Sequence, residues 1–282
     1  MPRGGSPGRS GTIRPNYSWR VLGLTGGDPS FRGDDGGADV AVTAALAAFA
    51  AGEAGEVGVL AALARSRLLV PVVAVLAEQL DPGQAESHGP PPACPPGLLS
   101  ARQEKASEMA MPTLIGLDGR RAIPAFTSLE SMRLWRSEAR PVPVAAGQVW
   151  AAAVAEGCAV VVDVGGPVPV AVEGARLAAL ARGDEPPPPF GDPDVHEVVA
   201  DVLAGQLAVT SFELRAPDAD GDLVIALTIA PGHAASSGTE LAAEIGNAVM
   251  ARLGGRLRRG VGIWLAVAGP AGPGADGPGR GG

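Results

Sequence analysis

The stretch GLDGRRAIPAFTSLE, residues 116–130, decides how the first half of this chain folds. Its Asp118-Gly119 pair lies between two apolar runs. Such a pair is typical of a tight β-hairpin turn, because Gly adopts the positive backbone angles that the turn needs and Asp tolerates them. Thr127 followed three residues later by Glu130 fits a capping box, which predicts a helix that begins at Ser128. The stretch therefore predicts a strand, a turn, a strand and a helix.

Further helices and strands are predicted on both sides of this stretch. Upstream, residues 40–51 predict a helix capped by Asp39, residues 55–67 a second helix, and the apolar run 67–76 a strand. Downstream, residues 140–182 predict a short extended segment, a helix ending at Gly157, a strand, a Gly165-Gly166 turn, a second strand and a helix. Two units, each a hairpin followed by a helix, are therefore expected in succession.

Proline limits where these strands can lie in the sheet. Because proline has no N–H to donate to a β-ladder, we expect prolines at sheet edges, strand starts or bulges. Four prolines fall in strand-like sequence: Pro71, Pro124, Pro143 and Pro169. The predicted fold class is thus mixed α/β (α+β), with an irregular mixed sheet whose best central strand is the apolar run 158–164.

The remaining sequence predicts a second, smaller domain. Residues 194–268 indicate a helix, two strands joined by an acidic loop, a helix with Ser237 and Glu240 as a capping box, and a last strand. Residues 183–193, GDEPPPPFGDP, are interpreted as a linker, since consecutive prolines favour an extended chain. The expected organisation is a flexible tail at 1–30, an N-terminal domain at 31–182 with a disordered loop at about 81–107, the linker, a small α+β domain at 194–268 and a disordered tail at 269–282.

Charge and composition exclude several classes of function. The net charge is −8 and Lys105 is the single lysine, so a P-loop is absent and a general polyanion-binding protein is not expected. The small basic cluster at residues 256–259 is explained by positive charge near a helix end. No apolar run reaches membrane-spanning length and the first residues do not form a secretory signal, so we predict a cytoplasmic protein without nucleic-acid or membrane partners.

The sequence contains no constellation of catalytic or metal-binding residues. The three histidines are dispersed, although folding could bring His196 and His233 together. Cys94 and Cys158 form no CxxC pair, and the aspartate clusters at 28–39 and 217–223 do not match a calcium loop. The glycines of VDVGGPVPV lack the following helix of a dinucleotide site. We therefore predict no catalytic residue, no metal site and no cofactor.

The chain resembles the SseB family, in particular its actinobacterial members, over about residues 25–182. Four segments carry the resemblance, in this order: GDDGGAD, LAALARSRLLVPVVAV, EKASEMAMPTLIGLDGRRAIPAFTSLESMRLW and ARPVPVAAGQVWAAAVAEGCAVVVDVGGPVPVAVEGARLAAL. The most specific parts are RLLVPVVA, IPAFTSLE and Trp135. The resemblance implies a mixed α/β N-terminal domain and, through the family's name, a link to enhanced serine sensitivity. It implies no catalytic residues.

The first hypothesis on function is a non-enzymatic binding or regulatory module with an unknown protein partner. Its candidate interaction surface is the segment where a predicted edge strand meets a helix start, since such a site accepts an added strand or a docking helix. The residues concerned are Pro124, Phe126, Thr127 and Trp135.

The second hypothesis, suggested by the family name alone, is a sensor or enzyme for a small molecule related to an amino acid. A ligand carboxylate would then lie at the helix N-terminus and pair with nearby arginines. The candidate anion contacts are Arg120, Arg121 and Ser128. The sequence leaves both hypotheses open.

Overall fold

The computed structural model describes residues 16–20, 29–76, 107–116, 118–217, 220–231 and 238–268. Contacts between Cα atoms divide the chain into two compact units. Unit 1 consists of Met1–Gly37 and Arg67–Val172, and unit 2 of Ala38–Ser66 and Glu173–Gly282. Unit 2 is therefore discontinuous in sequence. The domains predicted from the sequence are continuous segments of the chain, whereas unit 2 joins residues 38–66 to residues 173–282. Local sequence carries no signal for contacts between segments so far apart.

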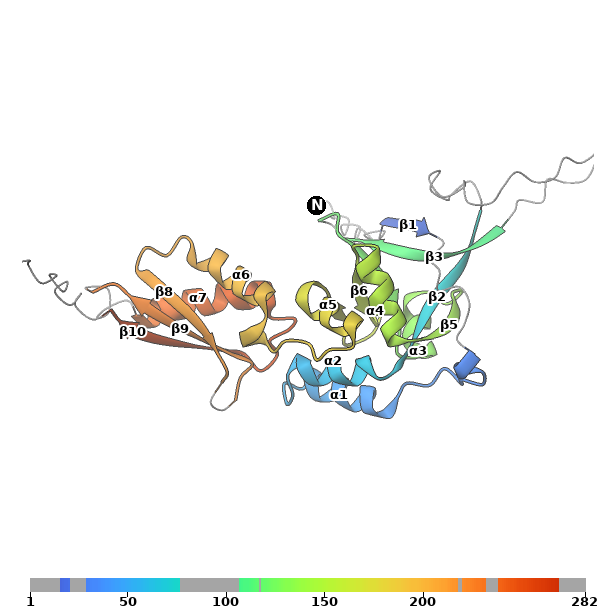
Figure 1. Ribbon diagram of the computed structural model, residues 1–282, viewed down its shortest axis with the longest axis horizontal. Coiled ribbons are helices and arrows are strands. Elements are labelled where there is room, and N and C mark those ends of the chain that lie inside the picture. The colour runs from blue at the N-terminus through green and yellow to red at the C-terminus, as the bar shows by residue number, and fades with distance from the viewer. Residues whose placement is uncertain are drawn as a thin grey trace, which may run out of the picture. The chain divides into compact units, whose positions relative to one another are not determined.

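Unit 1 is built on a mixed sheet with seven strands among the described residues (Figure 1). The strands are β1 (Asn16–Arg20), β2 (Arg67–Leu76), β3 (Ser107–Ile115), β4 (Arg121–Ala125), β5 (Arg140–Ala145), β6 (Ala159–Val162) and β7 (Val170–Val172). Their order is β5-β2-β3-β4-β6-β7, and β1 pairs with β3. The pairs are antiparallel except β4 and β6, which run parallel. The mixed α+β fold class is confirmed, while β1 shows that part of the predicted flexible tail at 1–30 forms a strand.

The predicted hairpin at Asp118-Gly119 is confirmed. β3 and β4 pair antiparallel, and the Gly116 N–H donates to the carbonyl of Arg120 at 2.8 Å. Gly119 has a φ of +79°, in the left-handed region that glycine adopts at little cost. The turn dipeptide therefore sets the register of the two strands that it joins.

Two of the four prolines lie in inner strands, but at places where one ladder is interrupted. Pro71 of β2 is opposite Pro141 of β5, and β2 pairs with β3 only from Val73 onward. Pro124 pairs with β6, whereas the ladder between β4 and β3 stops at Ala122. The prediction that these prolines lie at sheet edges, strand starts or bulges is therefore wrong for Pro71 and Pro124. Each is accommodated in an inner strand because it lies beyond the ladder that its strand forms with β3.

The helices of unit 1 are α3 (Leu129–Trp135) and α4 (Ala146–Ala155). α4 packs on β2, β4, β5 and β6 and buries Val149, Trp150 and Ala153. The capping box predicted from Thr127 and Glu130 is wrong by one residue. Ser128 is the N-cap of α3, and its hydroxyl accepts the N–H of Ser131 at 3.1 Å.

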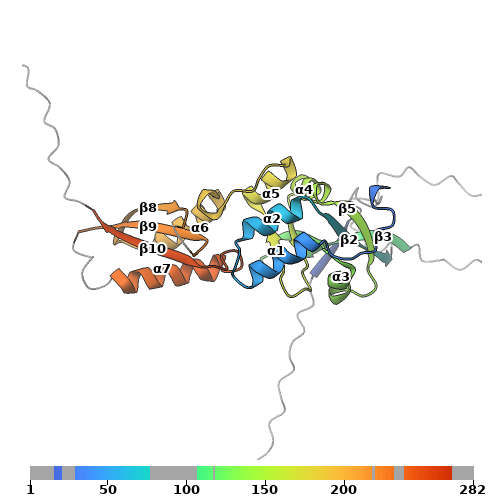
Figure 2. The same cartoon turned by 90° about the horizontal axis from the view of Figure 1, so that it is seen from below.

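Unit 2 combines two helices from residues 38–66 with elements from residues 173–282 (Figure 2). Its elements are α1 (Val40–Ala50), α2 (Glu56–Ala64), α5 (Gly174–Arg182), α6 (Pro193–Leu203), β8 (Val209–Arg215), β9 (Leu223–Ile229), α7 (Gly238–Leu253) and β10 (Val261–Val267). β8 and β9 form an antiparallel hairpin, and β10 joins β9 in parallel after the crossover through α7. Asp39 caps α1 as predicted, through the N–H groups of Ala41 and Val42.

One face of the three-stranded sheet in unit 2 carries the apolar core. Alternate residues of β9 pack against α6 and α7, as strand and helix periodicities require. The fully buried members include Leu223, Ile225 and Leu227 from β9, Val195 and Val199 from α6, and Ile245 and Val249 from α7. The elements predicted for residues 194–268 are thus present. Ser237 of the predicted capping box, the C-terminal tail and residues 81–106 of the loop predicted at about 81–107 lie outside the described residues, while Ser107 begins β3.

Among the described helices, none has the length and the apolar character that a membrane-spanning segment requires.

Candidate functional site

Two parallel strands end side by side in unit 1, and polar residues follow both ends. Thr127 lies two residues after β4, and Asp163 directly follows β6. In sheets with parallel strands, ligands bind beyond the carboxyl ends of those strands. We call Thr127, Ser128, Ser131 and Asp163 the carboxyl edge and take it as the candidate functional site.

Asp163 organises the carboxyl edge. Its carboxylate is buried and accepts two hydrogen bonds from Thr127, one from the backbone N–H at 2.9 Å and one from the hydroxyl at 2.7 Å. Its own N–H donates to the carbonyl of Ala125 at 2.9 Å. Among the described non-glycine residues Asp163 alone has a positive φ, 52°, a conformation that short polar side chains tolerate. The turn after β6 is thereby fixed to the turn after β4.

A charged pair fixes the other side of Thr127. Arg67, the first residue of β2, donates to the Thr127 carbonyl at 2.6 Å, to the Asp34 carboxylate at 2.9 Å and to the carbonyl of Gly37. Asp34 also accepts the N–H of Gly36 at 2.6 Å. The hydrogen bond from Arg67 holds the pKa of Asp34 below its ordinary value. The guanidinium therefore joins the loop at 33–37 to the carboxyl edge.

The candidate interaction residues lie mainly in the core of unit 1. Phe126 is fully buried with Leu69 and Met132, and its ring centroid lies 5.4 Å from that of the partly exposed Trp135. Pro124 and Thr127 are also buried. The predicted edge strand is wrong, because β4 lies between β3 and β6, and the side chains of Pro124, Phe126 and Thr127 expose little surface. The exposed residues of the same segment lie on α3 and are Glu130, Arg133 and Leu134.

The candidate anion contacts do not form one site. Arg120 pairs with the exposed Asp118 at 2.5 Å, and Arg121 donates to the carbonyl of Glu156 at 2.6 Å. Arg121 begins β4 whereas Ser128 follows its end, which separates them by roughly 20 Å of extended chain. The structure therefore places the two arginines and Ser128 at opposite ends of one strand.

Of the three histidines, the structure describes His196 alone. Its exposed side chain lies against Phe212, with ring centroids 4.8 Å apart. His88 and His233 lie outside the described residues, as does Cys94. Cys158 is buried, and its thiol donates to the carbonyl of Glu156 at 3.5 Å. In the described part of the chain no three His, Cys, Asp or Glu side chains come together closely enough to hold a metal ion.

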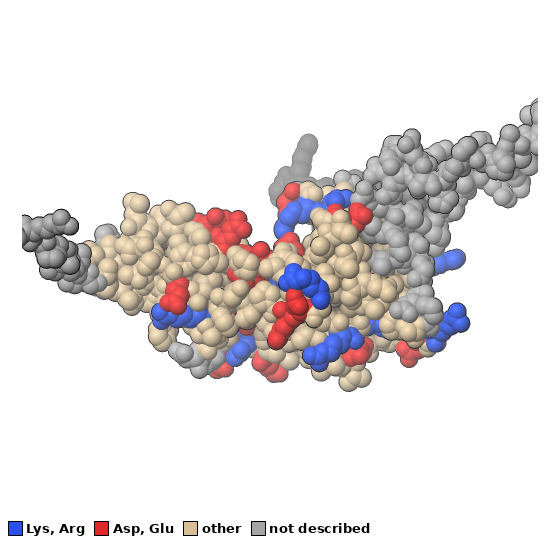
Figure 3. Space-filling view, in the orientation of Figure 1, with Lys and Arg blue, Asp and Glu red and all other residues tan. Residues whose placement is uncertain are grey.

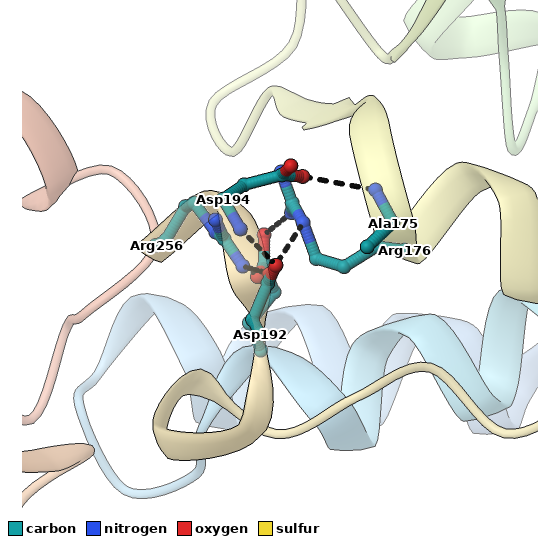
Figure 4. Close-up of polar contacts among 6 residues, drawn as sticks. Ala175, Arg176, Asp192, Asp194 and Arg256 are labelled. Atoms are coloured by element: carbon teal, nitrogen blue, oxygen red, sulfur yellow. Dashed lines mark hydrogen bonds and ion pairs between the residues drawn. The ribbon is translucent and has the colours of Figure 1, made fainter. Parts of the chain in front are cut away.

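Sequence reasoning missed a buried ionic cluster in unit 2, which Figure 4 shows in part. It consists of Glu56 from α2, Arg176 from α5, Asp192 before α6 and Arg256 after α7, and we call these four residues the ionic cluster. Arg176 contacts Glu56 at 2.5 Å and Asp192 at 3.7 Å. Arg256 contacts Glu56 at 3.0 Å and Asp192 at 2.6 Å. Each arginine thus pairs with both carboxylates.

Burial makes the ionic cluster costly unless its charges balance. The exposed fractions of Glu56, Arg176 and Asp192 are 4%, 2% and 1%. Burial lowers the pKa of Arg176. Burial also acts to lower the pKa of Arg256, but the carboxylates of Glu56 and Asp192 outweigh it, so the pKa of Arg256 is raised. Arginine stays charged in proteins, so two positive and two negative charges cancel. The residue types and the pairing of each arginine with both carboxylates indicate a structural role.

A second contact beside the ionic cluster joins α5 to α6. Asp194 accepts the N–H of Ala175 at 2.9 Å and so caps α5 from another helix, while its own N–H donates to Asp192 at 2.9 Å (Figure 4). Asp192-Pro193 was a detectable signal, because Asp at the N-cap followed by Pro at the first helical position is a common helix start. The segment predicted as a linker therefore includes a buried anchor.

The chain has a mixed α+β fold, and the carboxyl-edge residues form hydrogen bonds with one another, Thr127 with Asp163 and Ser128 with Ser131. The SseB protein N-terminal domain matches residues 42–179. The chain is therefore an SseB family protein, and the match extends from α1 into α5. No curated protein and no solved structure matches the chain.

Proposed function

We propose that this SseB family chain is a non-catalytic, cytoplasmic protein-binding module, and that the exposed residues of α3 contact its protein partner. These residues, Glu130, Arg133 and Leu134, are the α3 face. The observation that carries the proposal is the closed hydrogen bonding of the carboxyl edge. Its Asp, Thr and Ser side chains bind one another and hold the start of α3, so their chemistry serves to position that helix.

Close packing fixes α3 in place along its length. The Leu129 N–H donates to the carbonyl of Gly36 at 2.9 Å, and Met132 is buried in the core of unit 1. The chain after β6 approaches so closely that a Cβ on Gly165 would lie 2.9 Å from the backbone of Trp135. A rigid helix loses little conformational entropy on binding, which favours its use as a contact surface.

The composition of the α3 face indicates the chemistry of a partner. Leu134 is 64% exposed and has an acidic and a basic neighbour on the same short helix. Apolar anchors surrounded by polar residues are typical of protein interfaces. The matching partner is a protein with an apolar pocket for Leu134 and with charges that complement Glu130 and Arg133.

The test compares the full chain with Leu134→Asp. Immobilised proteins are incubated at one salt concentration with a lysate of the organism that makes the chain, and any retained protein is then purified and titrated. We expect a partner whose affinity falls by at least about tenfold for Leu134→Asp, because a buried carboxylate in an apolar pocket is strongly disfavoured. Leu207→Asp is the control, since Leu207 is 96% exposed in unit 2.

The outcomes separate the two hypotheses on function. Equal retention by wild type and Leu134→Asp, with equal unfolding temperatures, would contradict the proposal. A rise in the unfolding temperature on adding L-serine or a related amino acid, with no Leu134-dependent partner, would favour the small-molecule sensor instead, because a ligand that binds the folded state stabilises it.

A further inference from the structure

The outer strand of the unit 2 sheet is open along one side. β10 pairs with β9, and within the described residues no strand pairs with its other edge (Figure 2). Its sequence, VGIWLAV, contains neither a charged residue nor a proline. Edge strands are normally protected from association by charges, prolines or bulges. The surface over β8, β9 and β10 shows few charged side chains at the left of Figure 3.

One hydrogen bond shows which backbone groups of this strand point outward. The N–H of Ala268, just after β10, donates to the carbonyl of Ile229 in β9 at 2.9 Å. Along a strand the backbone groups of alternate residues point to opposite neighbours. The even-numbered residues of β10 therefore bond to β9. The residues whose N–H and C=O groups face the open edge are Val261, Ile263, Leu265 and Val267.

The side chains in the C-terminal half of β10, residues 264–267, are exposed. Trp264 is opposite Ala226 of β9, on the sheet face away from Ile225 and Leu227 and thus away from the core. Trp264 is 54% exposed and Val267 51% exposed. A half-exposed tryptophan on an uncharged edge strand is a surface that association would cover.

We propose that β10 pairs antiparallel with β10 of a second copy of this chain, about a two-fold axis at Trp264. The proposal is independent of the α3 face. In this register Trp264 lies opposite the partner's Trp264, and all seven residues of each strand are paired. The resulting sheet is continuous across the two copies, with the strand order β8-β9-β10-β10-β9-β8.

The sequence of β10 is complementary to itself in this register. Gly262 lies opposite the partner's Ala266, so small residues flank the two tryptophan rings on the open face. Ile263 lies opposite the partner's Leu265, and Val261 opposite the partner's Val267. An isologous interface requires such complementarity of one surface with itself, whereas a different partner protein does not. This symmetry is why we assign the edge to a second copy.

The backbone pattern agrees with the same axis. The outward-facing residues meet one another in four pairs, and each pair exchanges two bonds, which gives roughly eight hydrogen bonds. The two Trp264 residues then form a non-hydrogen-bonded pair, with Cα atoms about 4.5 Å apart and side chains in close contact. A contact of one strand per copy falls at the small end of specific interfaces, below about 1,200 Å². The dimer is therefore reversible and depends on concentration.

The first test measures the self-association of the full chain by sedimentation velocity over increasing concentration. We expect a monomer–dimer equilibrium for the wild type and for the control Leu207→Lys. For Trp264→Lys we expect a dimer dissociation constant at least about tenfold higher than that of the wild type, because two like charges then lie directly opposite each other across the axis. Circular dichroism and thermal unfolding verify that Trp264→Lys keeps the fold.

The second test determines the register by cross-linking in a Cys94→Ser background. Trp264→Cys places two thiols across the axis at a Cα distance that a disulfide accepts, so mild oxidation is expected to give a covalent dimer. Ala266→Cys is the matched control. Residue 266 pairs with residue 262 of the other copy, which leaves the two introduced thiols about 14 Å apart along the strand.

Three results would overturn the proposal. The first is a full chain that stays monomeric at every concentration, and the second is a Trp264→Lys variant that dimerises as tightly as the wild type. The third is equal cross-linking of Ala266→Cys and Trp264→Cys. If the full chain is monomeric but a chain ending at Ala268 dimerises, the C-terminal residues of the same chain occupy the edge in place of a second copy.

Discussion

Thr127 shows how one hydroxyl decides the start of a helix. Thr127 and Ser128 are both good N-cap residues, and each has a suitable partner three residues later. Asp163 decides between them, because its buried carboxylate needs hydrogen-bond donors and Thr127 supplies two, its N–H and its hydroxyl. Ser128 is left to cap α3. The choice depends on a residue 36 positions away, so spacing within the stretch 116–130 was not sufficient to predict it.

The first prediction concerns Asp34 and its pairing with Arg67. We expect Asp34→Asn to lower the free energy of unfolding by about 1–3 kcal/mol at pH 7, because it weakens a charge-assisted hydrogen bond. The pKa of Asp34 is lowered by folding, so its contribution is present above the ordinary value of 3.8 and is lost as the pH falls below it. The difference between variant and wild type should therefore narrow below that pH.

Urea denaturation at pH 7 and at pH 3 measures both effects. Asp35→Asn is the matched control, since the exposed Asp35 accepts the local N–H of Gly37 and its replacement should change stability by less than about 0.5 kcal/mol. Equal losses for the two variants at pH 7 would show that the pairing with Arg67 contributes nothing.

At the scale of elements, α5 is a helix whose N-terminus is capped from a distance. Glu173 occupies the N-cap position but makes no side-chain cap bond, and Asp194 supplies the acceptor instead. Gly174, the first residue of α5, has a φ of +59°, and a Cβ there would lie 1.8 Å from the Asp194 carboxylate. The absence of a side chain at position 174 is what lets α6 approach the start of α5.

The second prediction follows from this close approach. Gly174→Ala should lower the free energy of unfolding by about 2–4 kcal/mol, from the strained backbone and the displacement of Asp194 together. Gly58→Ala should instead raise it by about 0.5–1 kcal/mol, because Gly58 lies inside α2 with open space around its Cα. Chemical denaturation of the two variants measures the difference, and a neutral Gly174→Ala would rule out the close contact.

The prediction of elements from the sequence succeeded where the signals are local. The bounds of β2 match the apolar run 67–76, and the Asp118-Gly119 turn joins β3 to β4 as expected. The pairing of β2 with β5 and the parallel pairing of β4 with β6 were not predictable, since they join segments separated by other elements. The candidate segment 124–135 forms a strand followed by a helix, as predicted. The burial of its side chains was not predicted. A short strand covered on both faces shows no alternation to reveal which side chains are exposed.

At the scale of the whole molecule, the ionic cluster joins four segments of unit 2. The third prediction is that Arg176→Met lowers the free energy of unfolding by about 3–5 kcal/mol, because it leaves one buried carboxylate without a compensating charge. The double variant Arg176→Met/Glu56→Gln should lose less than the sum of the single losses, since Asp192 and Arg256 then form a balanced pair. A double-mutant cycle in urea measures this coupling.

The matched control for this cycle is Arg182→Met. Arg182 pairs with Asp184 at 2.7 Å, but both side chains are more than half exposed, so its loss should cost less than about 1 kcal/mol. Additive losses for Arg176 and Glu56 would mean that the buried charges act independently.

The discontinuity of unit 2 also orders events while the chain is being made. Glu56 leaves the ribosome 200 residues before its partner Arg256. At about 5–20 residues per second, α1 and α2 wait roughly 10–40 s for the segment that completes their unit. All of residues 67–172 emerge during that interval, so unit 1 can finish folding first, while the nascent helix α2 still presents Glu56 to water.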